Sequence, residues 1–187
     1  MSELRSQTLA RYADARIPRY TSYPAAPHFS ADFGVAEYRS WLSSLPVVEA
    51  SLYLHVPFCR AMCWYCGCHT SVTARDAPIG RYVNCLINEI GMVAGQVPAP
   101  PAVSHVHFGG GTPTLMTAEQ MHRLMGELRI RFEILPGAEI AIEIDPRTLA
   151  PDMAVALGQC GFNRASIGVQ SFDPAVQAAI NRLQSFE

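Results

Sequence analysis

From residue 50 onward the sequence alternates four times between a strand pattern and a helix pattern. Runs of apolar or alternating residues at 51–56, 103–108, 138–144 and 164–169 predict strands. Longer runs with helical spacing at 81–96, 118–132, 151–160 and 173–184 predict helices. Four successive strand–helix units predict an α/β fold with a parallel sheet and crossover helices. The loops that follow parallel strands then lie together at the carboxyl edge of the sheet.

Helix-terminal residues support this division of the chain. Thr117 is a suitable N-cap for the second helix, and Asp173 followed by Pro174 predicts the start of the fourth. Arg182 is expected on that fourth helix, about two and a half turns from its start. Residues 1–49 are predicted to be an N-terminal extension that holds the segment RYTSYP (19–24) and a short helix over 33–45. Residues 50–187 are predicted to form the core domain.

Composition and charge exclude several classes of protein. The chain has 187 residues, of which 49% are hydrophobic and 16% charged, so a folded core is expected. A net charge of -2 argues against a nucleic-acid partner, and all fourteen basic residues are arginine, which excludes lysine chemistry. No apolar run approaches the roughly 18 residues of a membrane span. The polar N-terminal sequence does not resemble a signal peptide, so a cytoplasmic location is expected.

Four of the six cysteines fall within ten residues, directly after the first predicted strand. Cys59, Cys63 and Cys66 have the spacing C-x-x-x-C-x-x-C, and Cys68 follows. Thiolates at such spacing bind zinc or an iron–sulfur cluster. Structural zinc usually takes two separated pairs of ligands, whereas three cysteines in one loop supply three corners of a cubane and leave one iron open. A zinc knuckle or buried packing is the alternative, and Cys68 has either a packing or a functional role.

The two remaining cysteines belong to predicted helices. Cys85 and Cys160 lie among apolar residues, and both are expected to be buried by packing rather than to bind a ligand.

Unusual residues also follow the other three strands. Gly109, Gly110 and Gly111 come after the second strand, where glycines let a ligand approach the backbone closely, although a simple tight turn is the favoured explanation of such a motif by itself. Glu143 ends the third strand and could bind a ribose or an ammonium group, or could simply be solvated. Gln170 follows the fourth strand. The topology therefore predicts one shared site at the carboxyl edge of the sheet.

The cysteine spacing, with Tyr65 before the last cysteine of the motif, resembles the radical S-adenosylmethionine superfamily. That resemblance implies a partial (βα) barrel and a [4Fe–4S] cluster held by Cys59, Cys63 and Cys66. It also implies that the amino and carboxylate groups of S-adenosylmethionine bind the fourth iron.

A longer set of motifs resembles one family within this superfamily, the oxygen-independent coproporphyrinogen III oxidases. The motifs are RYTSYP (19–24), SLYLHVPFC (51–59), CWYCGC (63–68), FGGGTPT (108–114), EIDPR (143–147), GFNRASIGVQSFDPAVQ (161–177) and INRLQ (180–184). The resemblance implies oxidative decarboxylation of coproporphyrinogen III to protoporphyrinogen IX in haem biosynthesis, by a 5′-deoxyadenosyl radical. It also implies an electron donor like flavodoxin or ferredoxin. A haem-chaperone-like protein, or a cluster-binding module without oxidase activity, is the alternative.

The resemblance also assigns binding residues, although it assigns no catalytic residue. Tyr53, Gly110 and Glu143 are expected to contact the S-adenosylmethionine on the cluster. A second S-adenosylmethionine is expected to contact Tyr65, Gly111, Thr112, Gln170 and Arg182. Because members of this family are more than twice as long, we expect an incomplete barrel of about four βα units that binds a cluster but does not turn over substrate alone.

Overall fold

The structure is a computed structural model that describes residues 25–46 and 49–186. The chain divides into two compact units, residues 1–38 and 39–187, and the division falls inside helix α2 (Val35–Ser43). The described part of the first unit holds a short 3-10 helix, η1 (Ala26–His28), and the start of α2. Helix α2 confirms the helix expected over 33–45. The RYTSYP segment lies outside the described residues, and the domain boundary at residue 49 stays a prediction.

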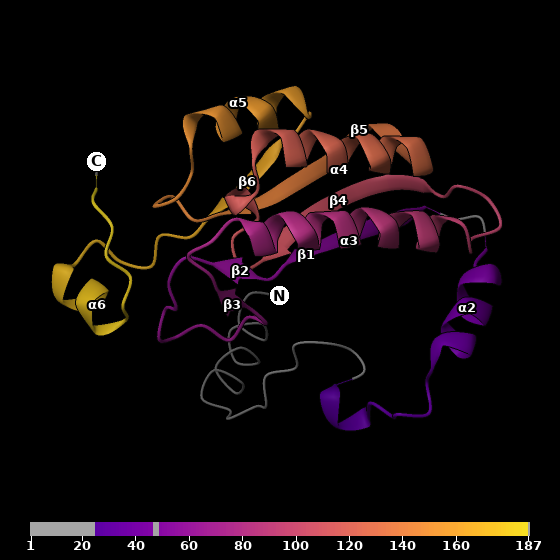
Figure 1. Cartoon of the computed structure of the whole chain (residues 1–187), viewed down its shortest axis with the longest axis horizontal. Coiled ribbons are helices and arrows are strands. Elements are labelled where there is room, and N and C mark those ends of the chain that lie inside the picture. Colours follow the sequence, from indigo (N-terminus) through magenta and orange to yellow (C-terminus); the bar gives the residue numbers. More distant parts are fainter. Residues whose placement is uncertain (1–24, 47–48, 187) are drawn as a thin grey trace, which may run out of the picture. The chain divides into compact units, whose positions relative to one another are not determined.

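The second unit contains the four-stranded sheet that the alternation predicts (Figure 1). The strands are β1 (Ala50–Val56), β4 (Ala102–Gly110), β5 (Glu133–Ile144) and β6 (Arg164–Ile167). They pair in parallel in the order β1-β4-β5-β6. Strand β5 begins five residues earlier than predicted, because Glu133 and Ile134 also pair with the start of β4. The parallel α/β fold is therefore confirmed.

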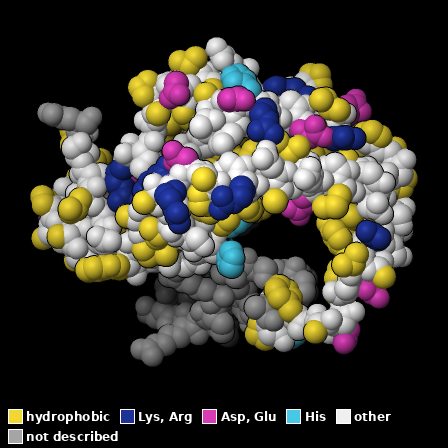
Figure 2. Space-filling model, viewed as in Figure 1, with side chains coloured by type: hydrophobic (Ala, Val, Ile, Leu, Met, Phe, Trp, Pro, Cys, Tyr) yellow, Lys and Arg dark blue, Asp and Glu magenta, His cyan; other side chains and the backbone are white. Residues whose placement is uncertain are grey.

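Three helices cover one face of the sheet: α3 (Ala77–Ala94), α4 (Ala118–Arg131) and α5 (Pro151–Gln159). Alternate residues of β1, β4 and the second half of β5 point into this core, as Leu54, Val56 and Phe108 do, whereas all four residues of β6 are exposed. The residues between them, such as Tyr53 and His107, lie on the opposite face. Figure 2 shows that arginine and acidic side chains are interspersed over the helices on the face it displays.

Local capping explains where two of the helices begin. The Thr117 hydroxyl accepts a hydrogen bond from the Gln120 N–H, and the Gln120 side chain accepts one from the Thr117 N–H, which completes a capping box at α4. Asp173 caps α6 (Pro174–Ala179) by accepting hydrogen bonds from the N–H groups of Ala175 and Val176. Both predicted N-caps are confirmed.

Two expectations about helices are wrong. Helix α6 ends at Ala179, and Asn181 adopts a left-handed φ of 52°, so Arg182 lies beyond the helix rather than on it. Cys85 is exposed, because the buried stripe of α3 runs through Ile79, Val83, Leu86 and Ile90 and leaves position 85 outside it. Cys160 is buried, as predicted.

Candidate functional site

The cysteine loop, defined here as residues 59–68, contacts the rest of the chain at its base and at its far side. At its base, strand β2 (Phe58–Cys59) pairs in parallel with β3 (Ser71–Val72). At its far side, the Trp64 N–H donates to the Ile180 carbonyl at 3.0 Å, and the Asn181 side chain donates to the Met62 carbonyl at 2.7 Å. The turn after α6, which Figure 1 shows beyond the carboxyl end of the sheet, therefore holds the loop in place.

The glycine loop, residues 109–112, packs directly on the chain that leads into the cysteine loop. The Gly111 N–H donates to the Val56 carbonyl at 2.9 Å, and the Thr112 N–H donates to the Phe58 carbonyl at 2.7 Å. A Cβ on Gly111 would lie 2.5 Å from the Phe58 oxygen, so only glycine permits this approach. Gly110 has a φ of 113°, a conformation that other residues rarely adopt.

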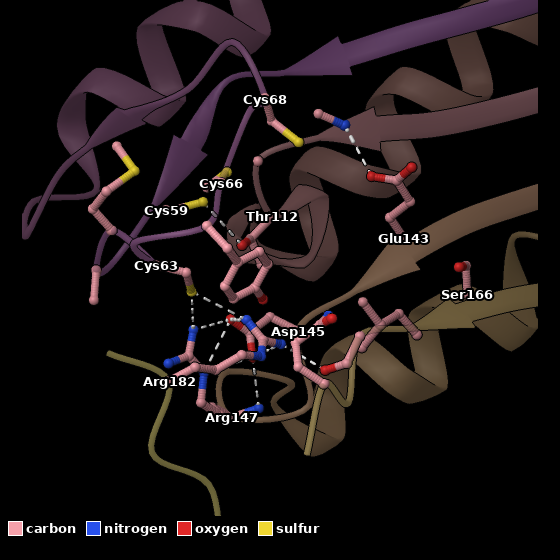
Figure 3. Close-up of a pocket in the computed structure, with 18 residues that line it drawn as sticks. Cys59, Cys63, Cys66, Cys68, Thr112, Glu143, Asp145, Arg147, Ser166 and Arg182 are labelled. Atoms are coloured by element: carbon pink, nitrogen blue, oxygen red, sulfur yellow. Dashed lines mark hydrogen bonds and ion pairs between the residues drawn. The ribbon is translucent and has the colours of Figure 1, made fainter. Parts of the chain in front are cut away.

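A cavity of about 220 Å³ lies at the carboxyl edge of the sheet, between these two loops (Figure 3). Cys59, Cys63, Cys66 and Cys68 line it on one side. Every predicted cofactor-binding residue except Tyr53 also lines it, namely Tyr65, Gly110, Gly111, Thr112, Glu143, Gln170 and Arg182. The loops after four different strands thus converge on one site, as the topology predicts.

Glu143 and Tyr53 flank the glycine loop on the open face of the sheet. The Glu143 carboxylate accepts a hydrogen bond from the Gly110 N–H at 3.1 Å, and its other oxygen lies 3.4 Å from the His107 ring nitrogen. Tyr53 stacks on His107 and lies close to Gly109, where an added Cβ would come within 3.0 Å of its ring. Partial burial, and then the negative charge of Glu143, raise the pKa of Tyr53. Tyr53 therefore borders the cavity without lining it.

An ion cluster made by Asp145, Arg147 and Arg182 lines the cavity next to Cys63 (Figure 3). Asp145 accepts from the Arg147 Nη2 at 2.6 Å and from the Arg182 Nη2 at 3.3 Å. Both guanidinium groups also point to the Cys63 sulfur, at 3.7 Å from Arg147 and 3.5 Å from Arg182 (Figure 3). Burial acts to raise the pKa of Asp145, but the hydrogen bonds and charge of Arg147 outweigh it, so that pKa is lowered.

Asp145 and Arg147 are absent from the binding residues predicted from the sequence. The signal that could have identified them is the motif EIDPR, which places an acid and an arginine directly after the third strand. Arg182 was predicted as a binding residue, but on a helix. It instead follows the left-handed turn at Asn181 and lines the cavity.

The donor set fits an iron–sulfur cluster better than a single metal ion. No three of the described His, Cys, Asp and Glu side chains come close enough to hold one metal ion. Thiolates that bind three different irons of a cubane stand further apart than ligands of a single ion, which is consistent with three cysteines spread along one cavity wall. Arg182, which is only 7% exposed, also lines this cavity, and its Nε has no hydrogen-bond partner among the described residues.

Cys68 differs from the other three cysteines of the loop. It is exposed, and Figure 3 shows it beside Glu143 rather than among the arginines. Partial burial of its thiol, followed by the proximity of Cys66, raises the pKa of Cys68. The chain therefore places a fourth thiol at the edge of the cavity nearest Glu143.

Comparison with known proteins gives a consistent result. Residues 53–187 match the Radical SAM superfamily. The chain is 56% identical over 185 residues to an oxygen-independent coproporphyrinogen III oxidase of Bradyrhizobium diazoefficiens, covering 98% of this chain and 41% of that protein. A second such oxidase, from Escherichia coli, is 43% identical over 91% of this chain and 37% of its own length.

A solved structure, described as coproporphyrinogen III oxidase (HemN) from Escherichia coli, a radical SAM enzyme, superposes with a TM-score of 0.84. It is 41% identical, over 96% of this chain and 39% of that chain. The chain thus spans about two fifths of the length of the relatives it matches. In the described residues, no helix combines the length and apolar character that crossing a membrane requires.

Proposed function

This chain belongs to the Radical SAM superfamily, and on that premise we propose that it carries the cluster and S-adenosylmethionine sites of an oxygen-independent coproporphyrinogen III oxidase. The observation that carries the proposal is the convergence of Cys59, Cys63 and Cys66 with the glycine loop and Glu143 on one cavity. These groups come from loops and strand ends in different strand–helix units, so the packing of a single loop does not explain why they lie at the same cavity.

The three thiols are the proposed ligands of a [4Fe–4S] cluster. The chemistry that such a cluster supplies, when bound and reduced, is the cleavage of S-adenosylmethionine to a 5′-deoxyadenosyl radical. Coproporphyrinogen III is the proposed substrate, and a low-potential protein such as a flavodoxin or ferredoxin is the proposed electron donor. All six cysteines are free, which supports a reducing compartment such as the cytoplasm.

The residues around the cavity suit the groups of S-adenosylmethionine. Glu143 offers a carboxylate at the glycine loop, where it can accept hydrogen bonds from an ammonium or a ribose. Gly110 lines the cavity with its backbone alone, in a φ of 113° that favours glycine, so it presents no side chain to a ligand. We propose that Tyr53, Gly110 and Glu143 bind the S-adenosylmethionine on the cluster.

The remaining lining residues of the cavity suit a second S-adenosylmethionine. Arg182 lines this part of the cavity with a positively charged guanidinium, which suits a carboxylate. The Gln170 side chain lies close to that of Arg182. A Cβ added to Gly168 would lie 3.2 Å from the Arg182 Nη2 and 3.7 Å from the Gln170 Nε2. We propose that Tyr65, Gly111, Thr112, Gln170 and Arg182 form this second binding site.

Anaerobic reconstitution with iron and sulfide tests the cluster ligands. We expect about one [4Fe–4S] cluster per chain, with its brown colour, because three thiolates and one external ligand satisfy a cubane. Replacing Cys59, Cys63 or Cys66 with Ala should each abolish the colour, whereas Cys68→Ala should retain it. Cys85→Ala is the matched control, because that cysteine is exposed on α3, away from the cavity lining. A preparation that needs Cys68 but not Cys59 would overturn the ligand assignment.

Two product assays separate an enzyme from a binding module. With S-adenosylmethionine and dithionite, an enzyme releases 5′-deoxyadenosine, and a module that only binds the cluster does not. Conversion of coproporphyrinogen III to protoporphyrinogen IX then tests the substrate. Release of 5′-deoxyadenosine without any porphyrinogen conversion would support the superfamily chemistry and agree with the expectation that this chain does not turn over substrate alone, whereas conversion by this chain alone would contradict that expectation.

A further inference from the structure

We propose that Arg147 sets the reduction potential of the cluster through the Cys63 sulfur, and that Asp145 is the positioning residue that holds Arg147 there. This inference rests on the proposed function, since it requires Cys63 to be a cluster ligand. It concerns residues for which no cofactor contact is proposed above.

The geometry gives Arg147 two partners at once. Its Nε donates to the Asp145 carboxylate at 2.9 Å, and its Nη2 donates to the same carboxylate at 2.6 Å. Nη2 carries a second hydrogen, and it lies 3.7 Å from the Cys63 sulfur. The planar guanidinium of Arg147 can therefore bind the Asp145 carboxylate through Nε and Nη2 and direct the second hydrogen of Nη2 toward the Cys63 sulfur.

Asp145 makes this arrangement rigid. Its side chain is 12% exposed, and it also accepts a hydrogen bond from its own chain at the Arg147 N–H, at 3.1 Å. It binds Arg182 as well, whose Nη1 lies 3.5 Å from the same sulfur. One buried carboxylate thus orients two cations toward a single thiol.

The cysteine at the start of the loop has a different environment. The Cys59 sulfur lies 3.4 Å from the Thr70 hydroxyl and 3.5 Å from the Thr112 hydroxyl, both of which are neutral. Cys63 instead faces two guanidinium groups. The ligand set is therefore electrostatically asymmetric, and the cationic donors concentrate on Cys63.

Cationic donors at a thiolate ligand have a predictable effect on a cluster. Reduction from the 2+ to the 1+ state adds one electron, supplied here by an external one-electron donor, and makes the cluster and its ligands more negative. Hydrogen bonds to the sulfurs and nearby positive charge stabilise the more negative state, so they raise the reduction potential. Arg147 should therefore make the cluster easier to reduce.

The test is a redox titration of the reconstituted chain, in which the electron paramagnetic resonance signal measures the amount of reduced cluster. In Arg147→Gln, we expect the ratio of reduced to oxidised cluster at a fixed potential to fall about tenfold, which is a midpoint about 59 mV lower for a one-electron couple. Arg147→Lys keeps the charge, but an ammonium cannot hold Asp145 with two donors and also face Cys63, so its midpoint should fall as well. Arg131→Gln is the matched control, since Arg131 pairs with Glu127 on helix α4.

The outcomes distinguish this inference from the function on which it rests. Wild-type protein that takes up no cluster overturns the proposed function and this inference together. Full cluster content with an unchanged midpoint in Arg147→Gln overturns only this inference. An unchanged midpoint in Arg147→Lys alone shows that charge acts without the geometry, which refutes the positioning role of Asp145. If neither Arg147 variant takes up a cluster, Arg147 holds the cluster rather than tunes it, and the inference also fails.

Discussion

Replacing Gly111 with Ala should damage the connection between the glycine loop and the cysteine loop. The new Cβ would lie 2.5 Å from the Phe58 oxygen and 2.6 Å from the Thr70 hydroxyl. The Thr70 side chain can rotate away. The Phe58 carbonyl cannot, because it already accepts the Thr112 N–H at 2.7 Å. The glycine loop itself must therefore move.

The size of that movement gives the expected cost. The loop must retreat by about 0.9 Å for the Cβ to reach ordinary contact with the Phe58 oxygen at 3.4 Å. A shift of that size stretches the two hydrogen bonds of Gly111 and Thr112 beyond their useful range. Overpacking costs about 1–3 kcal/mol and each weakened hydrogen bond about 0.5–1.5 kcal/mol. We expect Gly111→Ala to lower the free energy of unfolding by about 3 kcal/mol, or the Tm by about 6–12 °C.

Thermal unfolding of the metal-free chain, followed by circular dichroism, measures this change. Gly126→Ala is the matched control, since a Cβ at that position of α4 meets nothing within 4 Å and should add about 1 kcal/mol of stability through helix propensity. A Tm for Gly111→Ala within about 2 °C of wild type would refute the reasoning, because it would mean that the two loops adjust without losing their hydrogen bonds.

Three further changes have defined outcomes. Gly110→Val should weaken S-adenosylmethionine binding in titrations while iron content is kept, because Gly110 has a φ of 113° and its Cβ would lie 2.7 Å from the His55 ring. Asp145→Asn should lower the unfolding free energy at pH 7 by about 2 kcal/mol. Since the folded-state pKa of Asp145 is lowered, this difference should be complete above its ordinary pKa of about 4 and disappear as pH falls through the lower folded value, in denaturation curves at several pH values. Thr117→Ala removes the hydroxyl that caps α4 and should cost about 1 kcal/mol in the same assay.

Features that depend on neighbouring residues could be predicted from the sequence. The strands and helices of the second unit have apolar periodicities that a short window reveals, and the caps at Thr117 and Asp173 are local signals. The convergence of the cysteines with Gly110 and Glu143 also follows from the sequence, because parallel strands bring their carboxyl ends to one edge.

Features that depend on distant contacts could not be predicted in this way. The helical pattern continues through residue 184, but the hydrogen bond from Asn181 to Met62, 119 positions away, accompanies a left-handed turn that moves Arg182 off the helix. The proximity of Arg147 to Cys63 likewise joins residues 84 positions apart. No local preference carries information about such pairs. Cys85 is a different case, since the stripe from Ile79 to Ile90 could have identified it as exposed.

The contact between the cysteine loop and the turn after α6 imposes an order of events during synthesis. Met62 and Trp64 leave the ribosome well over a hundred residues before their partners Asn181 and Ile180. At about 5–20 residues per second, the cysteine loop therefore waits several seconds or more with its far side open. Until then, the loop is held at its base, by the short pairing of β2 with β3 and by the contacts of the glycine loop, but its far side lacks the two hydrogen bonds from the turn after α6. The complete set of contacts around the cysteine loop can therefore form only after the fourth strand–helix unit has emerged, and a nascent chain that stalls before residue 180 leaves the far side of this loop open.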